Sequence, residues 1–172
     1  FGNALVVDVT DGSTTTLALP ERVLRDYLGG AGLGVWLMTE LAPPGVDPLD
    51  PAAPLAFVFS PLVGTPLTTS AKFAVVAKSP LTGLLTDALA SSHFAISGKF
   101  TGHDAIVLTG RAQAPAHLLI DADGVRLVDA APQWGMSASD AEESLRAQHG
   151  RRWRAACIGP AGERGVRYAT IS

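Results

Sequence analysis

Short apolar runs separated by turn residues dominate the chain and predict many short strands. Two pairs of such runs are each joined by an Asp-Gly dipeptide: residues 5–9 with 14–19 around Asp11-Gly12, and residues 118–121 with 125–129 around Asp123-Gly124. Asp-Gly between two β-prone runs is a strong hairpin signal, because the turn needs positive φ. The pattern therefore predicts two β-hairpins.

Each predicted hairpin leads into a stretch with helical spacing of its apolar residues. The first begins at Glu21. Residues Gly29 to Gly32 are expected to break or sharply bend it, because glycine destabilises the interior of a helix. The second has Ser137 or Ser139 as its N-cap and Gly150 just past its end.

Further β-prone runs follow each helix. After a proline-rich connector, Pro43 to Pro54, we expect strands at Leu55–Ser60 and Lys72–Ala77. After the second helix we expect strands at Trp153–Ile158 and Val166–Ile171. Another antiparallel pair is predicted between residues 105–109 and 117–121, joined through Gly110 to Pro115.

The order of these elements suggests an internal duplication of a β-hairpin–helix–β unit. The repeats cover roughly residues 5–110 and 116–172, and the second is incomplete, because nothing in it corresponds to Lys78 to Gly110. Many short strands with two helical segments argue for an α+β fold with two largely antiparallel sheets. We expect residues 1–172 to form a single domain.

Composition narrows the functional classes. The net charge of −3 over 172 residues argues against nucleic acid as a partner. No apolar run is long enough for a membrane span, and the first residues lack the pattern of a signal peptide. The single Cys157 excludes an internal disulfide or a multi-thiolate cluster within this chain, and a reducing cytoplasm is the simplest compartment.

Several candidate motifs have structural explanations. Gly29 to Gly34 resembles a dinucleotide fingerprint, but it follows a helix and not a strand, so a tight helix–helix junction is the better interpretation. His93 and His103 have no partner at metal-ligand spacing, and Cys157 lies in an apolar run as a core thiol. We therefore assign no catalytic and no metal-ligating residue.

Two stretches carry possible binding chemistry. In Lys72 to Gly83 a strand delivers two lysines to a Ser-Pro and Thr-Gly turn, whose backbone N–H groups suit phosphate oxygens. The alternative is an ordinary strand end with solvated lysines. The small residues from Leu89 to His93 would let a large flat ligand approach the backbone. The alternative there is close packing of a sheet.

Seven motifs together resemble the N-terminal domain of the aldehyde ferredoxin oxidoreductase family, the tungsten-pterin enzymes. They occur in the family's order and spacing across nearly the whole chain: Tyr27 to Gly34, Pro44 to Leu49, Ser60 to Thr65, Val76 to Gly83, Lys99 to Val107, Trp134-Gly135 and Cys157 to Glu163. The resemblance implies two antiparallel sheets that form a base for a tungsten or molybdenum bis-pterin cofactor, with Mg²⁺ bridging the pterin phosphates. Further helical domains of the family supply a [4Fe-4S] cluster and the substrate channel.

The resemblance also implies a set of cofactor-binding positions. These are Lys72, Lys78, Ser79, Leu89, Ala90, Ser91, Ser92 and His93. The resemblance implies that the segment from Lys78 to His93 is a loop on one side of the paired pterins. The set departs from the family pattern: Lys72 stands where the family has an arginine, and Leu89 to Ser92 replace Asn-Ser-Gly-Gly. A lysine keeps the charge but loses the planar, bidentate fork of arginine.

Two hypotheses follow. The first is the cofactor-binding domain of an enzyme that oxidises aldehydes to carboxylates and passes electrons to ferredoxin. We expect that domain to be a fragment, inactive by itself and partnered by the C-terminal domains of the parent enzyme or by a partner subunit. The alternative is a stand-alone, degenerate domain that acts as a non-redox binding or assembly module, which the altered cofactor positions favour.

Overall fold

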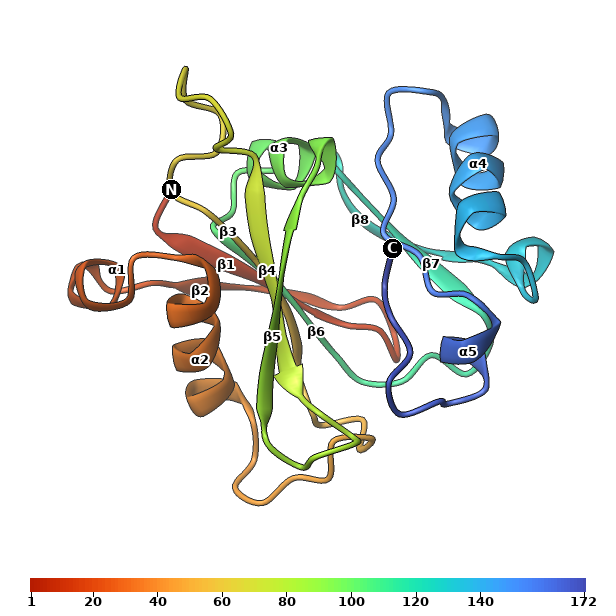
Figure 1. The fold of residues 1–172 in the computed structure, drawn as a ribbon, viewed down its shortest axis with the longest axis horizontal. Helices are drawn as coiled ribbons and strands as arrows, with labels where there is room; N and C mark the ends of the chain where they lie inside the picture. Colours follow the sequence, from red (N-terminus) through yellow and green to blue (C-terminus); the bar gives the residue numbers. More distant parts are fainter.

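The computed structural model describes residues 1–172 as an α+β fold with two β-sheets (Figure 1). Strands β1 (Asn3–Asp8) and β2 (Thr14–Ala18) form the first predicted hairpin, with Ala4 opposite Leu17. Gly12 has a φ of 78° in the connecting turn, a value that glycine adopts at little cost. The structure confirms the hairpin and the reason for its glycine.

The helical stretch after the hairpin is divided into α1 (Glu21–Tyr27) and α2 (Gly30–Leu41). Between them Leu28 and Gly30 have positive φ values of 60° and 55°, so the predicted break is confirmed. A Cβ atom on Gly29 would lie 2.8 Å from Cδ of Pro61 and 3.1 Å from the carbonyl oxygen of Phe59. The glycine therefore lets the junction pack directly against the end of the next strand.

A six-stranded sheet forms the centre of the molecule, in the order β2-β1-β6-β3-β4-β5. Its other strands are β3 (Leu55–Phe59), β4 (Lys72–Lys78), β5 (Leu85–Ser91) and β6 (Ala105–Thr109). Neighbouring strands are antiparallel except β1 and β6, which run parallel. Helix α3 (His93–Phe100) connects β5 to β6.

The two faces of this sheet have separate apolar cores, because successive strand residues point to opposite faces. On one face α2 buries Leu33 and Leu37 against Val58 and Val76, among others. On the other face α3 covers a phenylalanine cluster that includes Phe59, which is 1% exposed. Burial on both faces explains the nearly continuous apolar sequence of β3.

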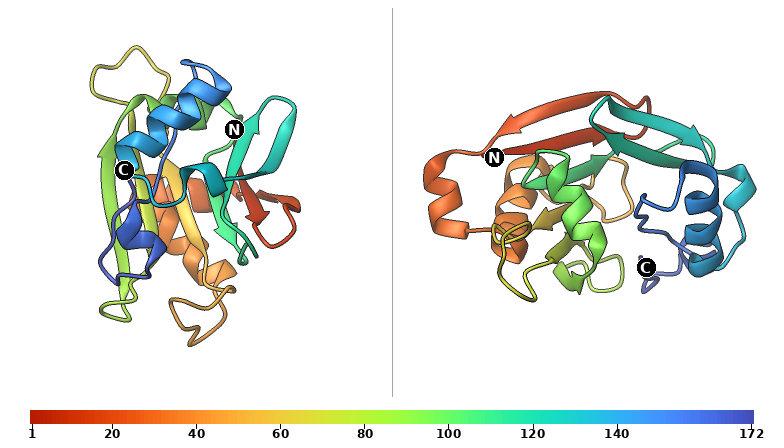
Figure 2. Two further views of the ribbon diagram at one scale, coloured as in Figure 1. Left: turned by 90° about the vertical axis from the view of Figure 1, so that its right-hand side faces the viewer. Right: turned by 90° about the horizontal axis from the view of Figure 1, so that it is seen from above.

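The C-terminal part of the chain lies on the sheet face opposite α1 and α2 (Figure 2). Strands β7 (Ala116–Asp121) and β8 (Gly124–Asp129) form the second predicted hairpin and the two-stranded sheet. A 3₁₀ turn, η1 (Ala131–Gln133), leads to α4 (Ala138–His149), and a short α5 (Pro160–Glu163) follows. Ser137 is the N-cap of α4, since its Oγ accepts a hydrogen bond from Asp140 N–H at 3.2 Å.

Three predictions from the sequence are wrong. Residues 105–109 do not pair with residues 117–121: β6 lies between β1 and β3, and β7 pairs with β8. Residues 153–158 and 166–171 are not strands, and only an isolated bridge joins Ile158 to Ile171. The segment from Lys78 to His93, expected to be a loop, contains the whole of β5.

The predicted fold class is confirmed: the molecule is α+β, with two sheets whose strands are mostly antiparallel. The second hairpin and its helix correspond in order to β1, β2 and the first helices, but no strands follow them. The internal duplication therefore stays a prediction. None of the helices combines the length and the apolar character that crossing a membrane requires.

Candidate functional site

Six of the eight predicted binding residues gather at one end of the β4–β5 pair. Lys72, the first residue of β4, lies directly opposite Ser91, the last residue of β5. Leu89 and Ala90 precede Ser91 on the same strand, and Ser92 and His93 follow it into α3. The antiparallel register therefore assembles this set from positions about twenty residues apart in the chain. We call it the Lys72 site.

The polar groups of the Lys72 site all present hydrogen-bond donors. Lys72 Nζ donates to Ser91 Oγ at 2.8 Å, which leaves two of the three ammonium protons free. Ser92 is the N-cap of α3, and its Oγ accepts from Phe94 N–H at 3.1 Å. His93 is exposed at the first helical position. A helix N-terminus carries a partial positive charge and free N–H groups, which suits anionic oxygen.

The N-terminus of α2 lies at the same end of the sheet. Gly29 packs against Phe59 and Pro61 at the end of β3, and Ser60 N–H donates to the carbonyl oxygen of Lys72 at 3.0 Å. The first N–H groups of a helix have no intrahelical partner, and here no side chain caps them either. Sequence reasoning missed this helix end, because it treated the glycine run only as a junction.

The other two predicted residues lie at the opposite end of β4. Lys78 pairs with Leu85, and β4 rises about 3.3 Å per residue, so the two lysine Cα atoms are roughly 20 Å apart. Lys78 Nζ donates to the carbonyl oxygen of Val46 at 2.6 Å and lines a cavity of about 330 Å³ beside the C-terminal end of α2. Ser79 Oγ accepts from the N–H groups of the following turn. The structure therefore separates Lys78 and Ser79 from the Lys72 site.

Strand β5 forms an open edge next to the Lys72 site. All its residues are exposed, Leu89 by 65%, and its outer backbone edge has no partner strand. An exposed edge offers unpaired N–H and C=O groups to a ligand or to another chain segment. Apolar side chains beside free backbone donors are suited to a large, flat ligand with polar edges.

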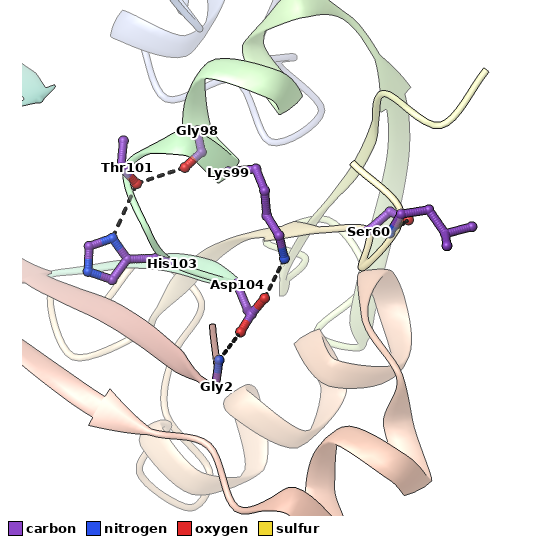
Figure 3. Close-up of polar contacts among 8 residues, drawn as sticks. Gly2, Ser60, Gly98, Lys99, Thr101, His103 and Asp104 are labelled. Atoms are coloured by element: carbon purple, nitrogen blue, oxygen red, sulfur yellow. Dashed lines mark hydrogen bonds and ion pairs between the residues drawn. The ribbon is translucent and has the colours of Figure 1, made fainter. Parts of the chain in front are cut away.

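A buried ion pair anchors α3 at its other end (Figure 3). Lys99 on α3 contacts Asp104, just before β6, and Gly2 N–H donates to the second carboxylate oxygen of Asp104 at 2.6 Å. Burial raises the pKa of Asp104, but hydrogen bonds from Lys99 and Gly2 outweigh it, and the net pKa is lowered. Sequence reasoning missed this ion pair, because no pattern in the chain shows that the two charges meet inside the protein.

The remaining candidate groups show no catalytic arrangement. Burial lowers the pKa of His103, against the pull of the Asp104 charge, and its Nδ1 lies 3.2 Å from Thr101 Oγ1. Cys157 is buried, and both burial and the charge of Glu142 raise the pKa of its thiol, as expected for an inert core cysteine. No three His, Cys, Asp or Glu side chains gather closely enough to hold a metal ion.

The fold and the site together define an α+β domain with hydrogen-bond donors gathered at one end of its main sheet. The family model of the aldehyde ferredoxin oxidoreductase N-terminal domain matches residues 4–172. The chain is 36% identical over 172 residues to the tungsten-containing aldehyde ferredoxin oxidoreductase of Pyrococcus furiosus, covering 99% of this chain and 28% of that protein. The chain therefore belongs to the aldehyde ferredoxin oxidoreductase N-terminal domain family.

Two further relatives broaden the comparison. The aliphatic sulfonate oxidoreductase, WOR-like subunit, of Pyrococcus furiosus is 33% identical over 147 residues, 84% of this chain and 23% of the relative. The solved active site complex BamBC of benzoyl coenzyme A reductase, in complex with 1,5-dienoyl-CoA, superposes with a TM-score of 0.92 and 34% identity. That match covers 99% of this chain and 26% of the solved chain. The chain thus spans about a quarter of the proteins that it resembles.

Proposed function

We propose that this chain is the cofactor-binding N-terminal domain of an aldehyde:ferredoxin oxidoreductase-like enzyme. The whole enzyme would oxidise an aldehyde to a carboxylate with a tungsten or molybdenum bis-pterin and pass the electrons to ferredoxin. The relatives are tungsten-containing aldehyde ferredoxin oxidoreductases, which supports the reaction and the metal. This chain spans only 28% of the length of such a relative, which supports a domain that is inactive by itself.

The observation that carries the proposal is the convergence of Lys72, Ser91 and the N-terminus of α3 at an open sheet edge. A bis-pterin cofactor carries phosphate groups, and this donor set fits their oxygens. Lys72 would donate through its two free protons, Ser91 and Ser92 through their hydroxyls, and His93 through its backbone N–H at the start of α3. Leu89 and Ala90 would offer backbone groups and a flat apolar surface to the pterin rings.

The bound cofactor would supply the metal centre that accepts the electrons of aldehyde oxidation. The chain's own residues hold and orient it. A single ammonium at Lys72, in place of a guanidinium, makes fewer hydrogen bonds to a phosphate, so we expect weaker retention than an arginine would give. Lys78 and Ser79 lie too far along β4 to share that phosphate, and their contact with the cofactor stays a prediction.

The partners follow from the same proposal. The C-terminal domains of the parent enzyme, or a partner subunit, would cover the open edge at β5 and supply the [4Fe-4S] cluster. Ferredoxin and an aldehyde would then be partners of the whole enzyme. We place it in the cytoplasm, which the single buried cysteine supports by offering no disulfide.

Elemental analysis of the natively purified protein tests the proposal. One tungsten or molybdenum atom per protein, with phosphorus in proportion to the pterin phosphates, is the expected result. Protein that folds with its natural partners but carries neither metal nor phosphorus would contradict it. That outcome would favour the degenerate, non-redox binding or assembly module.

A further inference from the structure

Two histidines meet head to head in the C-terminal part of the molecule. His117 lies on β7, and His149 is the last residue of α4. Their Nε2 atoms are 3.1 Å apart, with ring centroids separated by 5.2 Å. Both rings line a largely apolar cavity of about 600 Å³, which lies between the six-stranded sheet and the C-terminal part of the chain and is partly open to solvent. Sequence reasoning missed this pair, because its two residues are 32 positions apart in the chain.

The surroundings of His117 decide where the shared proton lies. His117 Nδ1 is buried and has no hydrogen-bond partner, so an N–H at that position would be left unsatisfied. We therefore assign the proton of neutral His117 to Nε2, from which it donates to the unprotonated Nε2 of His149. A bridging metal is disfavoured, because a ligating His117 would need a proton on the partnerless Nδ1 and no third ligand is near.

Protonation in acid breaks the hydrogen bond between the two histidines. A proton added to Nε2 of His149 removes the acceptor and places two N–H groups face to face. Burial lowers the pKa of His117 and the neighbouring His149 lowers it further, while Asp129 on β8 opposes both effects. Other charged groups border the same cavity from β7, α4, α5 and the segment after α4: Asp121, Arg146, Arg152, Arg154 and Glu163.

We propose that the His117–His149 pair is a pH-sensitive latch, which holds the last turn of α4 on β7 above neutral pH and releases it in mild acid. Release would open one wall of the apolar cavity. Gln133 Nε2 makes two other polar contacts with α4: it donates to Ser144 Oγ at 3.0 Å and, more weakly, to Gln148 Oε1 at 3.4 Å. Neither contact titrates, and the stronger one lies before the last turn, so acid loosens the last turn and leaves the rest of α4 held. The latch does not depend on the proposed cofactor site.

Hydrogen exchange followed by mass spectrometry tests the latch. The protonated fraction of a released histidine with the ordinary pKa of about 6.5 is about ten times larger at pH 5.5 than at pH 7.5. After correction for intrinsic exchange rates, the amides of residues 145–150 should therefore open about ten times more often at pH 5.5. Amides in the first turns of α4 should change little, because Gln133 and the Ser137 cap still hold them.

Two variants separate the latch from general acid sensitivity. In His149→Gln the amide oxygen accepts from His117 at any pH, so the tenfold response should disappear. His103→Gln is the matched control, because His103 also has a lowered pKa but lies away from α4, and the response should persist. A response that survives in His149→Gln, or that vanishes in His103→Gln, would overturn the proposal.

A measurement on the unaltered protein guards against a variant that fails to fold. Nitrogen-15 shifts of the imidazole rings report which nitrogen carries the proton. At pH 7.5 the latch requires His117 protonated on Nε2 and His149 on Nδ1. The opposite tautomer on His117 would contradict the latch without any substitution.

Discussion

Replacing Lys99 by methionine tests how strongly the buried ion pair stabilises the fold around α3. The side chains of Lys99 and Asp104 are only 7% and 13% exposed. Methionine fills nearly the same volume but removes the positive charge. Asp104 would then be left buried with a single hydrogen bond, from Gly2 N–H.

The expected loss is about 3 kcal/mol of unfolding free energy. Removing one partner of a buried ion pair costs about 3–5 kcal/mol, because the remaining charge stays desolvated. The lower end applies because Asp104 keeps its backbone hydrogen bond. The lowered pKa of Asp104 means that wild-type stability from this group is present above the ordinary Asp pKa and is lost as the pH falls below it. The difference between the two proteins should therefore shrink in acid below about pH 4.

Urea denaturation followed by far-ultraviolet circular dichroism at pH 7 measures this loss as a lower midpoint with an unchanged slope. Lys72→Met is the control: its ammonium bonds only to an exposed serine hydroxyl, so it should lose less than about 1 kcal/mol. In the double variant Lys99→Met/Asp104→Asn the buried charge is gone, and part of the loss should return. A Lys99→Met protein as stable as the Lys72→Met control would refute the reasoning.

Three further predictions concern packing, capping and pH. Gly98→Ala should lose about 1–3 kcal/mol in the same urea assay, since its Cβ would lie 2.2 Å from a buried phenyl ring of β3, and an unchanged midpoint would contradict this contact. Ser137→Ala should cost about 1 kcal/mol through the lost cap of α4, whereas Ser139→Ala should cost almost nothing, and equal losses would argue against the observed cap. His103 and His117 have lowered pKa values, so their neutral forms stabilise the fold, and calorimetry should show a melting temperature that falls as the pH drops from 7.5 to 5.5.

Local chemistry made part of the fold predictable. Gly12 and Gly124 adopt positive φ in the two hairpins, a conformation that an Asp-Gly turn signals in the sequence itself. The break between α1 and α2 was likewise signalled by the glycine run. Each of these features depends on a few neighbouring residues, so a single sequence is enough to find it.

Long-range pairing explains the errors. Strand β5 contains alanines and an aspartate, which are uncommon in strands, and it exists because its seven residues pair in register with β4. Residues 153–158 show the reverse, since their sequence favours a strand but the structure gives them no ladder to join. The placement of β6 beside β1 also depends on residues about a hundred positions away.

The residues of the candidate site could be proposed from the sequence, but their arrangement in space could not. The sequence pattern and the family resemblance selected Lys72 and Lys78 together, because both lie on one strand beside turn residues. Only the pairing of β4 with β5 shows that Lys72 reaches Ser91 and the N-terminus of α3, whereas Lys78 reaches the carbonyl of Val46. Roles of residues on the same strand therefore separate only when the register is known.

Cofactor retention in the Lys72→Met and Lys78→Met variants tests the central claim most directly. Each is made in the full-length protein, and tungsten, molybdenum and phosphorus are measured per protein after purification. The loss of charge-assisted hydrogen bonds at Lys72 should weaken retention by about 1.5–3 kcal/mol, or roughly 10- to 150-fold, while Lys78→Met, which cannot reach the same phosphate, should weaken it less. Full retention in Lys72→Met, or loss in Lys78→Met alone, would contradict the assignment of phosphate binding to the Lys72 site.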